Sequence, residues 1–178
     1  MSKTSNIVFR GLHIVAWLIF IGLSIEAGAI VTNFVFSVFK PEMVGNLYQK
    51  LDLSSLHQQN KWAFYGIYSF VISISVLKAF MFYTVVMLMH RIDLSKPFSS
   101  YVSEQITKIS YYTLTIGFFS HMAHELTKNL LHHGYDVNKL NQFWEDGEAF
   151  ILMAAIIYVI AIIFKKGIEL QDENDLTV

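Results

Sequence analysis

Four stretches of this 178-residue chain are apolar over the length that a membrane-spanning helix needs. A bilayer core about 30 Å thick requires about 20 predominantly apolar residues in a helix. The stretch 149–164 contains no charged residue, whereas 109–126 is the most polar of the four because His121, His124 and Glu125 follow its apolar core. The sequence therefore predicts an all-α integral membrane protein of one domain, with an acidic tail over 165–178 and spans at 12–39, 62–89, 109–126 and 143–164.

The polar third span predicts how the four helices pack. A helix with His and Glu side chains is stable in lipid only if neighbouring helices cover its polar face, so we expect an antiparallel four-helix bundle. Its third helix is expected to begin as an amphipathic segment at the membrane surface, because one apolar stripe precedes the span. The loop 41–61 is expected to lie on the bilayer or to cap the bundle. The stripe consists of Phe98, Val102, Ile106 and Ile109.

Composition excludes several classes of protein. Charged residues make up 15% of the chain and hydrophobic residues 54%, whereas soluble domains contain about 25% charged residues. The chain has no cysteine, which excludes disulfides, thiol catalysis and cysteine-based metal sites. A net charge of −1 argues against direct nucleic-acid binding. No phosphate-binding loop, nucleophile elbow or dinucleotide motif is present, so the sequence gives no argument for an enzyme.

The distribution of basic residues predicts the orientation in the membrane. With four spans, both termini lie on one side. Seven Lys and Arg residues flank the spans on the side of the termini, against five on the opposite side. Because basic loops stay in the cytoplasm, we expect both termini in the cytoplasm of a bacterial inner membrane.

Two segments carry a family resemblance: Lys96-Pro97-Phe98-Ser99, which opens the third helix, and the C-terminal stretch 164–178, FKKGIELQDENDLTV. Together they resemble a bacterial membrane family of uncharacterised function, domain of unknown function 2975. The resemblance implies a small four-span protein and supplies no catalytic residues. Members often accompany a small helix-turn-helix regulator gene, which implies a regulatory, sensing or immunity-like role through partners. Such a regulator or another membrane protein is the expected partner, and the oligomeric state stays open.

Glu26 and Lys78 are isolated charges inside the first and second spans. An unpaired charge in mid-membrane costs at least about 2.5–3.5 kcal/mol. Counted from the inner helix ends, their heights differ by roughly 5 Å, which a Lys side chain can bridge. We expect an intramembrane charge pair that fixes helix register; a proton- or ligand-responsive site is the functional alternative.

A second cluster lies at the outer end of the third span. His121, His124 and Glu125 share one helix face, and Glu148 lies near the start of the fourth span. Imidazole and carboxylate groups suit a divalent metal, and a metal-binding protein with redox or transport activity is the alternative function. Position 128 is Lys128, so the H-E-x-x-H protease motif is incomplete. Hydrogen bonding across helices and pH sensing by histidine also stay open.

Two further features complete the candidate sites. His13 and His90 lie at the inner ends of neighbouring spans and could hold a haem. The final residues Asp175-Leu176-Thr177-Val178 are expected either to dock a partner or to form a solvated end.

Overall fold

The computed structural model describes residues 3–48, 51–94 and 97–175, and every regular element in these ranges is a helix. The all-α prediction is therefore confirmed. Three short helices are η1 (Pro41–Asn46), α2 (Ser54–Gln59) and η2 (Asn138–Phe143), and four long ones are α1 (Lys3–Phe39), α3 (Lys61–Arg91), α4 (Ser100–His132) and α5 (Gly147–Asp175).

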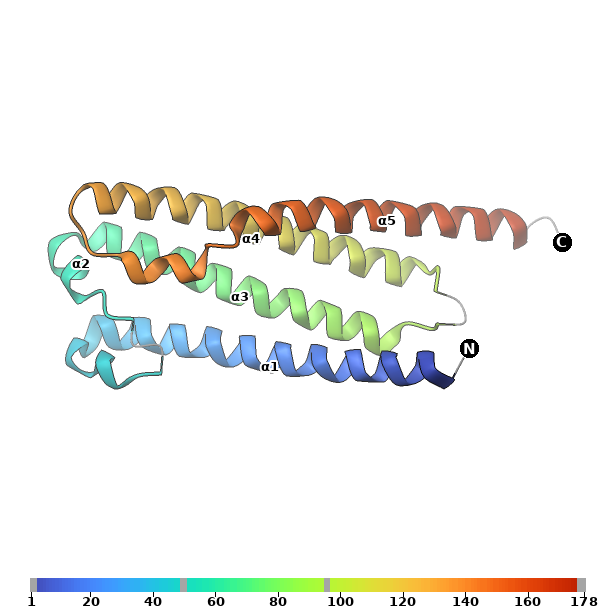
Figure 1. Ribbon diagram of the computed structural model, residues 1–178, viewed down its shortest axis with the longest axis horizontal. Coiled ribbons are helices and arrows are strands. Elements are labelled where there is room, and N and C mark those ends of the chain that lie inside the picture. The colour runs from blue at the N-terminus through green and yellow to red at the C-terminus, as the bar shows by residue number, and fades with distance from the viewer. Residues whose placement is uncertain (1–2, 49–50, 95–96, 176–178) are drawn as a thin grey trace.

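The long helices pack along one another (Figure 1). Helix α1 lies against α3, α3 against α4, and α4 against α5. Figure 1 places the N- and C-terminal ends at one end of the molecule, and α2 at the other. Among the described residues, three segments are long and apolar enough to cross a membrane: Ile7–Phe39, Lys61–Arg91 and Asn138–Asn174. This composition is that of a membrane protein, and α4 is not among these segments.

Helix α4 begins earlier than the predicted third span. The Ser99 hydroxyl accepts a hydrogen bond from the backbone N–H of Val102 at 3.4 Å, which caps the helix. Most of the predicted apolar stripe lies inside the protein, although Phe98 is 38% exposed. Val102 and Ile106 are buried with Ala161 of α5. The amphipathic pattern is therefore explained by packing of α4 against its neighbours.

The fourth predicted span, 143–164, differs from the structure at both ends. Its first residues belong to η2 and a turn, and α5 begins only at Gly147. Helix α5 then continues to Asp175, so the part of the acidic tail over 165–175 is helical. Figure 1 shows that α5 starts part-way along α4 and extends toward the end that holds both termini.

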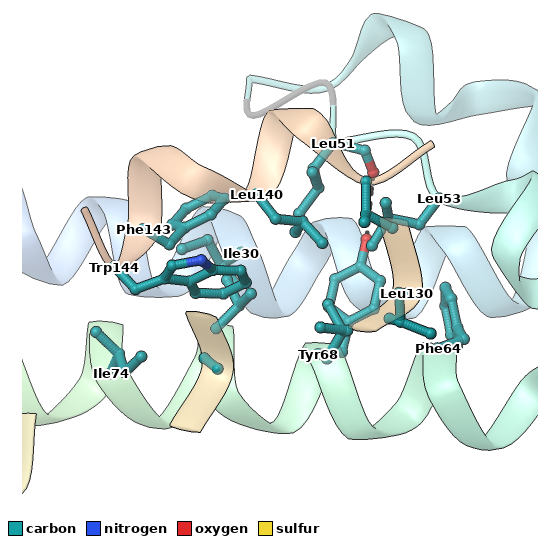
Figure 2. Close-up of a cluster of buried hydrophobic side chains, with 14 of the residues drawn as sticks. Ile30, Leu51, Leu53, Phe64, Tyr68, Ile74, Leu130, Leu140, Phe143 and Trp144 are labelled. Carbon is teal, nitrogen blue, oxygen red and sulfur yellow. Dashed lines mark hydrogen bonds between the residues drawn. The ribbon is translucent and has the colours of Figure 1, made fainter. Parts of the chain in front are cut away.

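The largest core lies where the connecting segments meet the helices (Figure 2). Leu51 and Leu53, which precede α2, and Leu140 of η2 are each at most 2% exposed. They pack with Phe64 and Tyr68 of α3, which are equally buried. Burying a large apolar side chain stabilises the fold by about 1.5–3 kcal/mol. The loop 41–61 therefore caps the helices, as one of the two expectations for it stated.

Exposed apolar side chains are most frequent on the stretches of α1 and α5 that lie away from this core. On α1 they are dense between residues 7 and 25, and beyond that only Val31, Val35 and Phe39 are large and exposed. On α5 they fill most positions between 151 and 163. We name these two stretches, with Phe80 and Tyr83 of α3 and Leu114 and Phe118 of α4, the apolar belt. The elements η1, α2 and η2 with the adjoining ends of α1, α3 and α4 form the head.

Candidate functional site

A polar pocket lies between α4 and the start of α5. It has a volume of about 220 Å³. Three of the four residues predicted as metal ligands line it, namely His121, His124 and Glu148, and Glu145 adds a second carboxylate. Glu125 does not line the pocket and is exposed. The remaining walls come from Ser120, Asn141, Trp144 and Gly147.

Two glycines make this pocket by bringing α4 and α5 into contact. A Cβ atom at Gly147 would lie 2.8 Å from the Cβ of Ser120. At Gly117 a Cβ would lie 2.6 Å from Cγ1 and 2.9 Å from the backbone nitrogen of Ile151. Further along, the Ser110 hydroxyl donates to the carbonyl of Ala154 at 3.0 Å. The first turn of α5 is therefore held beside the His121–His124 turn of α4.

The pocket combines exposed titratable groups with one buried donor. His121, His124, Glu145 and Glu148 are exposed, whereas Trp144 is 3% exposed and its indole Nε1 has no hydrogen-bond partner. No set of three or more His, Asp or Glu side chains in the described ranges is grouped closely enough to hold a metal ion. Three of the four predicted ligands therefore line one pocket, but they are not grouped around a position for an ion. Metal binding stays a prediction.

The predicted charge pair is not brought together. In the described part of the chain Glu26 and Lys78 form no ion pair; the ion pairs there join Glu104 to Lys108 and Lys166 to Glu169. The Lys78 ammonium instead lies 5.5 Å from the centre of the Phe150 ring of α5, a cation–π distance. Glu26 lines a separate recess on α1 with Gly22, Ile25 and Tyr48.

The two histidines that were predicted as a possible haem site, His13 and His90, are neighbours. The ring centres of His13 on α1 and His90 on α3 lie 6.0 Å apart at an angle of 53°. The Nε2 atom of His13 is buried and has no hydrogen-bond partner. The ends of α1 and α3 that carry these two residues therefore lie side by side, and a haem between the rings stays a prediction.

A buried polar cluster that the sequence did not reveal joins α1, α3 and the loop before α2. Asn33 is fully buried. In the orientation that satisfies its amide, it donates to the carbonyl of Leu51 at 2.9 Å and to the Tyr68 hydroxyl at 2.7 Å, and accepts from the N–H of Leu51 at 3.2 Å. The Tyr68 hydroxyl lies 3.0 Å from that of Ser37. The only sequence signal was Asn33 itself, an amide inside an apolar span.

The Asp52 carboxylate, which follows Leu51 in the sequence, stabilises the start of α2. It accepts a hydrogen bond from the backbone N–H of Ser54 at 3.0 Å. Hydrogen bonds from Ser54 lower the pKa of Asp52 below its usual value. Because this folded-state pKa is depressed, the contribution of Asp52 to stability is present near neutral pH and is lost only when the carboxylate protonates in acid.

The two segments that carry the family resemblance touch each other. The Phe98 ring packs on Gly167 of α5 so closely that a Cβ at Gly167 would lie 2.6 Å from Cδ1 of Phe98. The rings of Phe98 and Phe164 are 5.3 Å apart. Of the predicted docking tail, Asp175 ends α5, and Leu176, Thr177 and Val178 lie outside the described residues.

The chain matches one known protein family over most of its length. A family model described as "Protein of unknown function (DUF2975)" matches residues 48–178. The chain belongs to the DUF2975 family. No curated protein and no solved structure gives a significant match. The DUF2975 region holds the α4–α5 pocket and the Phe98–Gly167 contact, whereas His13, Glu26 and Asn33 on α1 lie before it.

Proposed function

We propose that this DUF2975 protein is integral to the bacterial inner membrane, with α1, α3, α4 and α5 as an antiparallel four-helix bundle and both termini in the cytoplasm. The support is the apolar belt. Large apolar side chains are exposed on α1 from Ile7 to Val35, about 42 Å along the helix axis, which matches a bilayer of about 40–45 Å with its headgroup regions. The head then projects from the outer face, because it lies at the end opposite both termini (Figure 1). Its connecting segments bury their leucines inside the protein and not in lipid.

We further propose a non-enzymatic sensing or regulatory role that acts through partners. The observation that carries it is the His121–Glu148 pocket, which lies between two helices locked together by Gly117 and Gly147. The pocket brings two imidazoles of α4 beside two carboxylates at the start of α5, so a change of charge there would alter how α5 packs on α4. The far end of α5 carries the helical acidic extension over 165–175. This extension would present the signal to a cytoplasmic or membrane partner.

Trp144 provides a direct optical test of the pocket. In a Trp17→Phe, Trp62→Phe background, the fluorescence of Trp144 is expected to change when the pH falls from 8 to 5, because Trp144 lines the pocket with His121 and His124. The added substitutions His121→Gln and His124→Gln should remove most of this change. His132→Gln is the matched control, since His132 is exposed on α4 and does not line the pocket. A change that survives the double substitution would contradict the proposal.

Metal binding is the second candidate function, because His121, His124 and Glu148 share the pocket. Elemental analysis of the purified protein tests it. One zinc, iron or copper ion per chain that is lost in His121→Ala would favour metal-dependent redox or transport activity over pH sensing.

A further inference from the structure

We propose that an anionic phospholipid binds in the seam between α1 and α3, with an acyl chain in an apolar groove and its phosphate at His13, His90 and Arg10. This proposal rests on the membrane placement given above. The seam has two parts, an apolar groove and a basic end. Side chains of both α1 and α3 contribute to each part.

The apolar part is a groove of about 410 Å³. Its α1 wall includes Ser24 and Ala27, and its α3 wall includes Ala79. These small side chains leave space between the two helices. The Ser24 hydroxyl is already bonded to the carbonyl of Phe20 at 2.7 Å, so it offers little polarity to the groove. Because the groove opens within the apolar belt, its natural occupant is a hydrocarbon chain.

Aromatic rings line the groove on the side that leads toward His13 and His90. Phe20 of α1 and Tyr83 of α3 line the groove, and their ring centres are 5.6 Å apart. Trp17 follows at 5.8 Å from Phe20. The three rings therefore continue the apolar groove along α1 toward its basic end.

The basic end lies one further turn along the same face of α1. Residues 10, 13, 17, 20 and 24 follow one another at spacings of three and four, so they form a continuous stripe. Arg10 and His90 are exposed, and the His13 ring lies 6.0 Å from that of His90. Arg91 is turned away, since its guanidinium lies 5.4 Å over the Tyr101 ring of α4.

Arg10 and His90 are exposed and can meet a lipid phosphate directly, whereas the His13 ring, whose Nε2 atom is buried without a protein partner, must rotate to do so. A lipid phosphate has acceptor oxygens for an imidazole N–H and for a guanidinium. From His13 to Ala27 the seam is about 21 Å long, which suits an extended acyl chain below a headgroup. Basic pockets between spanning helices on the cytoplasmic side are typical sites for anionic lipids.

Native mass spectrometry of the full chain tests the site with two lipids of identical acyl chains, phosphatidylglycerol and phosphatidylcholine. The wild type is expected to retain phosphatidylglycerol about tenfold more strongly, because phosphatidylglycerol has a net negative charge, whereas the choline ammonium neutralises phosphatidylcholine and is repelled by the basic side chains. Arg10→Gln with His13→Gln and His90→Gln should reduce this preference to near unity. Arg91→Gln is the matched control and should keep it. Ala79→Phe should weaken the binding of both lipids by filling the groove.

Three outcomes would overturn the proposal: no headgroup preference in the wild type, a preference that survives the triple substitution, or unchanged retention in Ala79→Phe. Arg10→Gln alone guards against misfolding, because Arg10 is exposed, and it should already lower the preference. The membrane placement fails separately, if the chain stays in the aqueous fraction of lysed cells without detergent. A chain that needs detergent but shows no preference contradicts the lipid site alone.

Discussion

The substitution Gly117→Ala is expected to lower the stability of the protein in detergent by about 1–3 kcal/mol, the cost of overpacking a closely packed core. The added Cβ would lie 2.6 Å from Cγ1 and 2.9 Å from the backbone nitrogen of Ile151. A backbone atom cannot rotate away, so α4 and α5 must separate. The measurement is the free energy or temperature of unfolding followed by circular dichroism.

Gly28→Ala is the matched control for this prediction. Gly28 lies on α1, and a Cβ there would meet nothing within 4 Å. Alanine favours a helix over glycine by about 0.8–1.0 kcal/mol, so this substitution should be neutral or stabilising. If the two variants unfolded alike, the close contact between α4 and α5 would not exist in the protein.

Asn33→Leu is expected to have the second large effect. It leaves the N–H of Leu51 without its acceptor and the Leu51 carbonyl with only the Tyr68 hydroxyl, at 3.2 Å, and Leu51 is 2% exposed. Each buried polar group left unsatisfied costs about 1–3 kcal/mol. The loop before α2 should then detach from α1 and become sensitive to protease. Limited proteolysis and the free energy of unfolding measure the two consequences.

Two other variants separate this effect from a general sensitivity of α1 and α3. Thr32→Val removes a hydroxyl that bonds only within its own helix, to the Gly28 carbonyl at 2.9 Å, and it should change little. Tyr68→Phe should cost less than Asn33→Leu, because the Asn33 amide still holds Leu51. A larger loss in Thr32→Val than in Asn33→Leu would contradict the cluster.

The helices were predictable because apolar stretches of this length admit few other structures, but their ends were not. Local hydropathy does not distinguish a side chain facing lipid from one buried under a connecting segment. Phe143 was therefore counted as part of a span, although it is 6% exposed within the core beneath the head. The same holds for the end of α1 near η1, because hydropathy does not show which of its apolar side chains face lipid and which are buried under the head.

The candidate sites were predictable only where they depend on spacing within one helix. His121 and His124 line one pocket because residues three apart share a face. The expected contact of Glu26 with Lys78 rested on matched height, and height does not give the rotation of each helix about its axis. Asn33 was missed because its partner Leu51 is brought to it by a loop that returns along α1.

Single-cysteine labelling tests the placement of the bundle in the membrane most directly, because the chain has no cysteine of its own. Lys128→Cys in the head, Leu114→Cys in the apolar belt and Asp172→Cys in the acidic extension each place a thiol at an exposed position. With a membrane-impermeant maleimide on spheroplasts, we predict labelling of Lys128→Cys alone. Asp172→Cys should react only after the membrane is permeabilised, and Leu114→Cys only after it is dissolved in detergent. Labelling of Asp172→Cys in intact spheroplasts, or equal labelling of all three, would contradict the account.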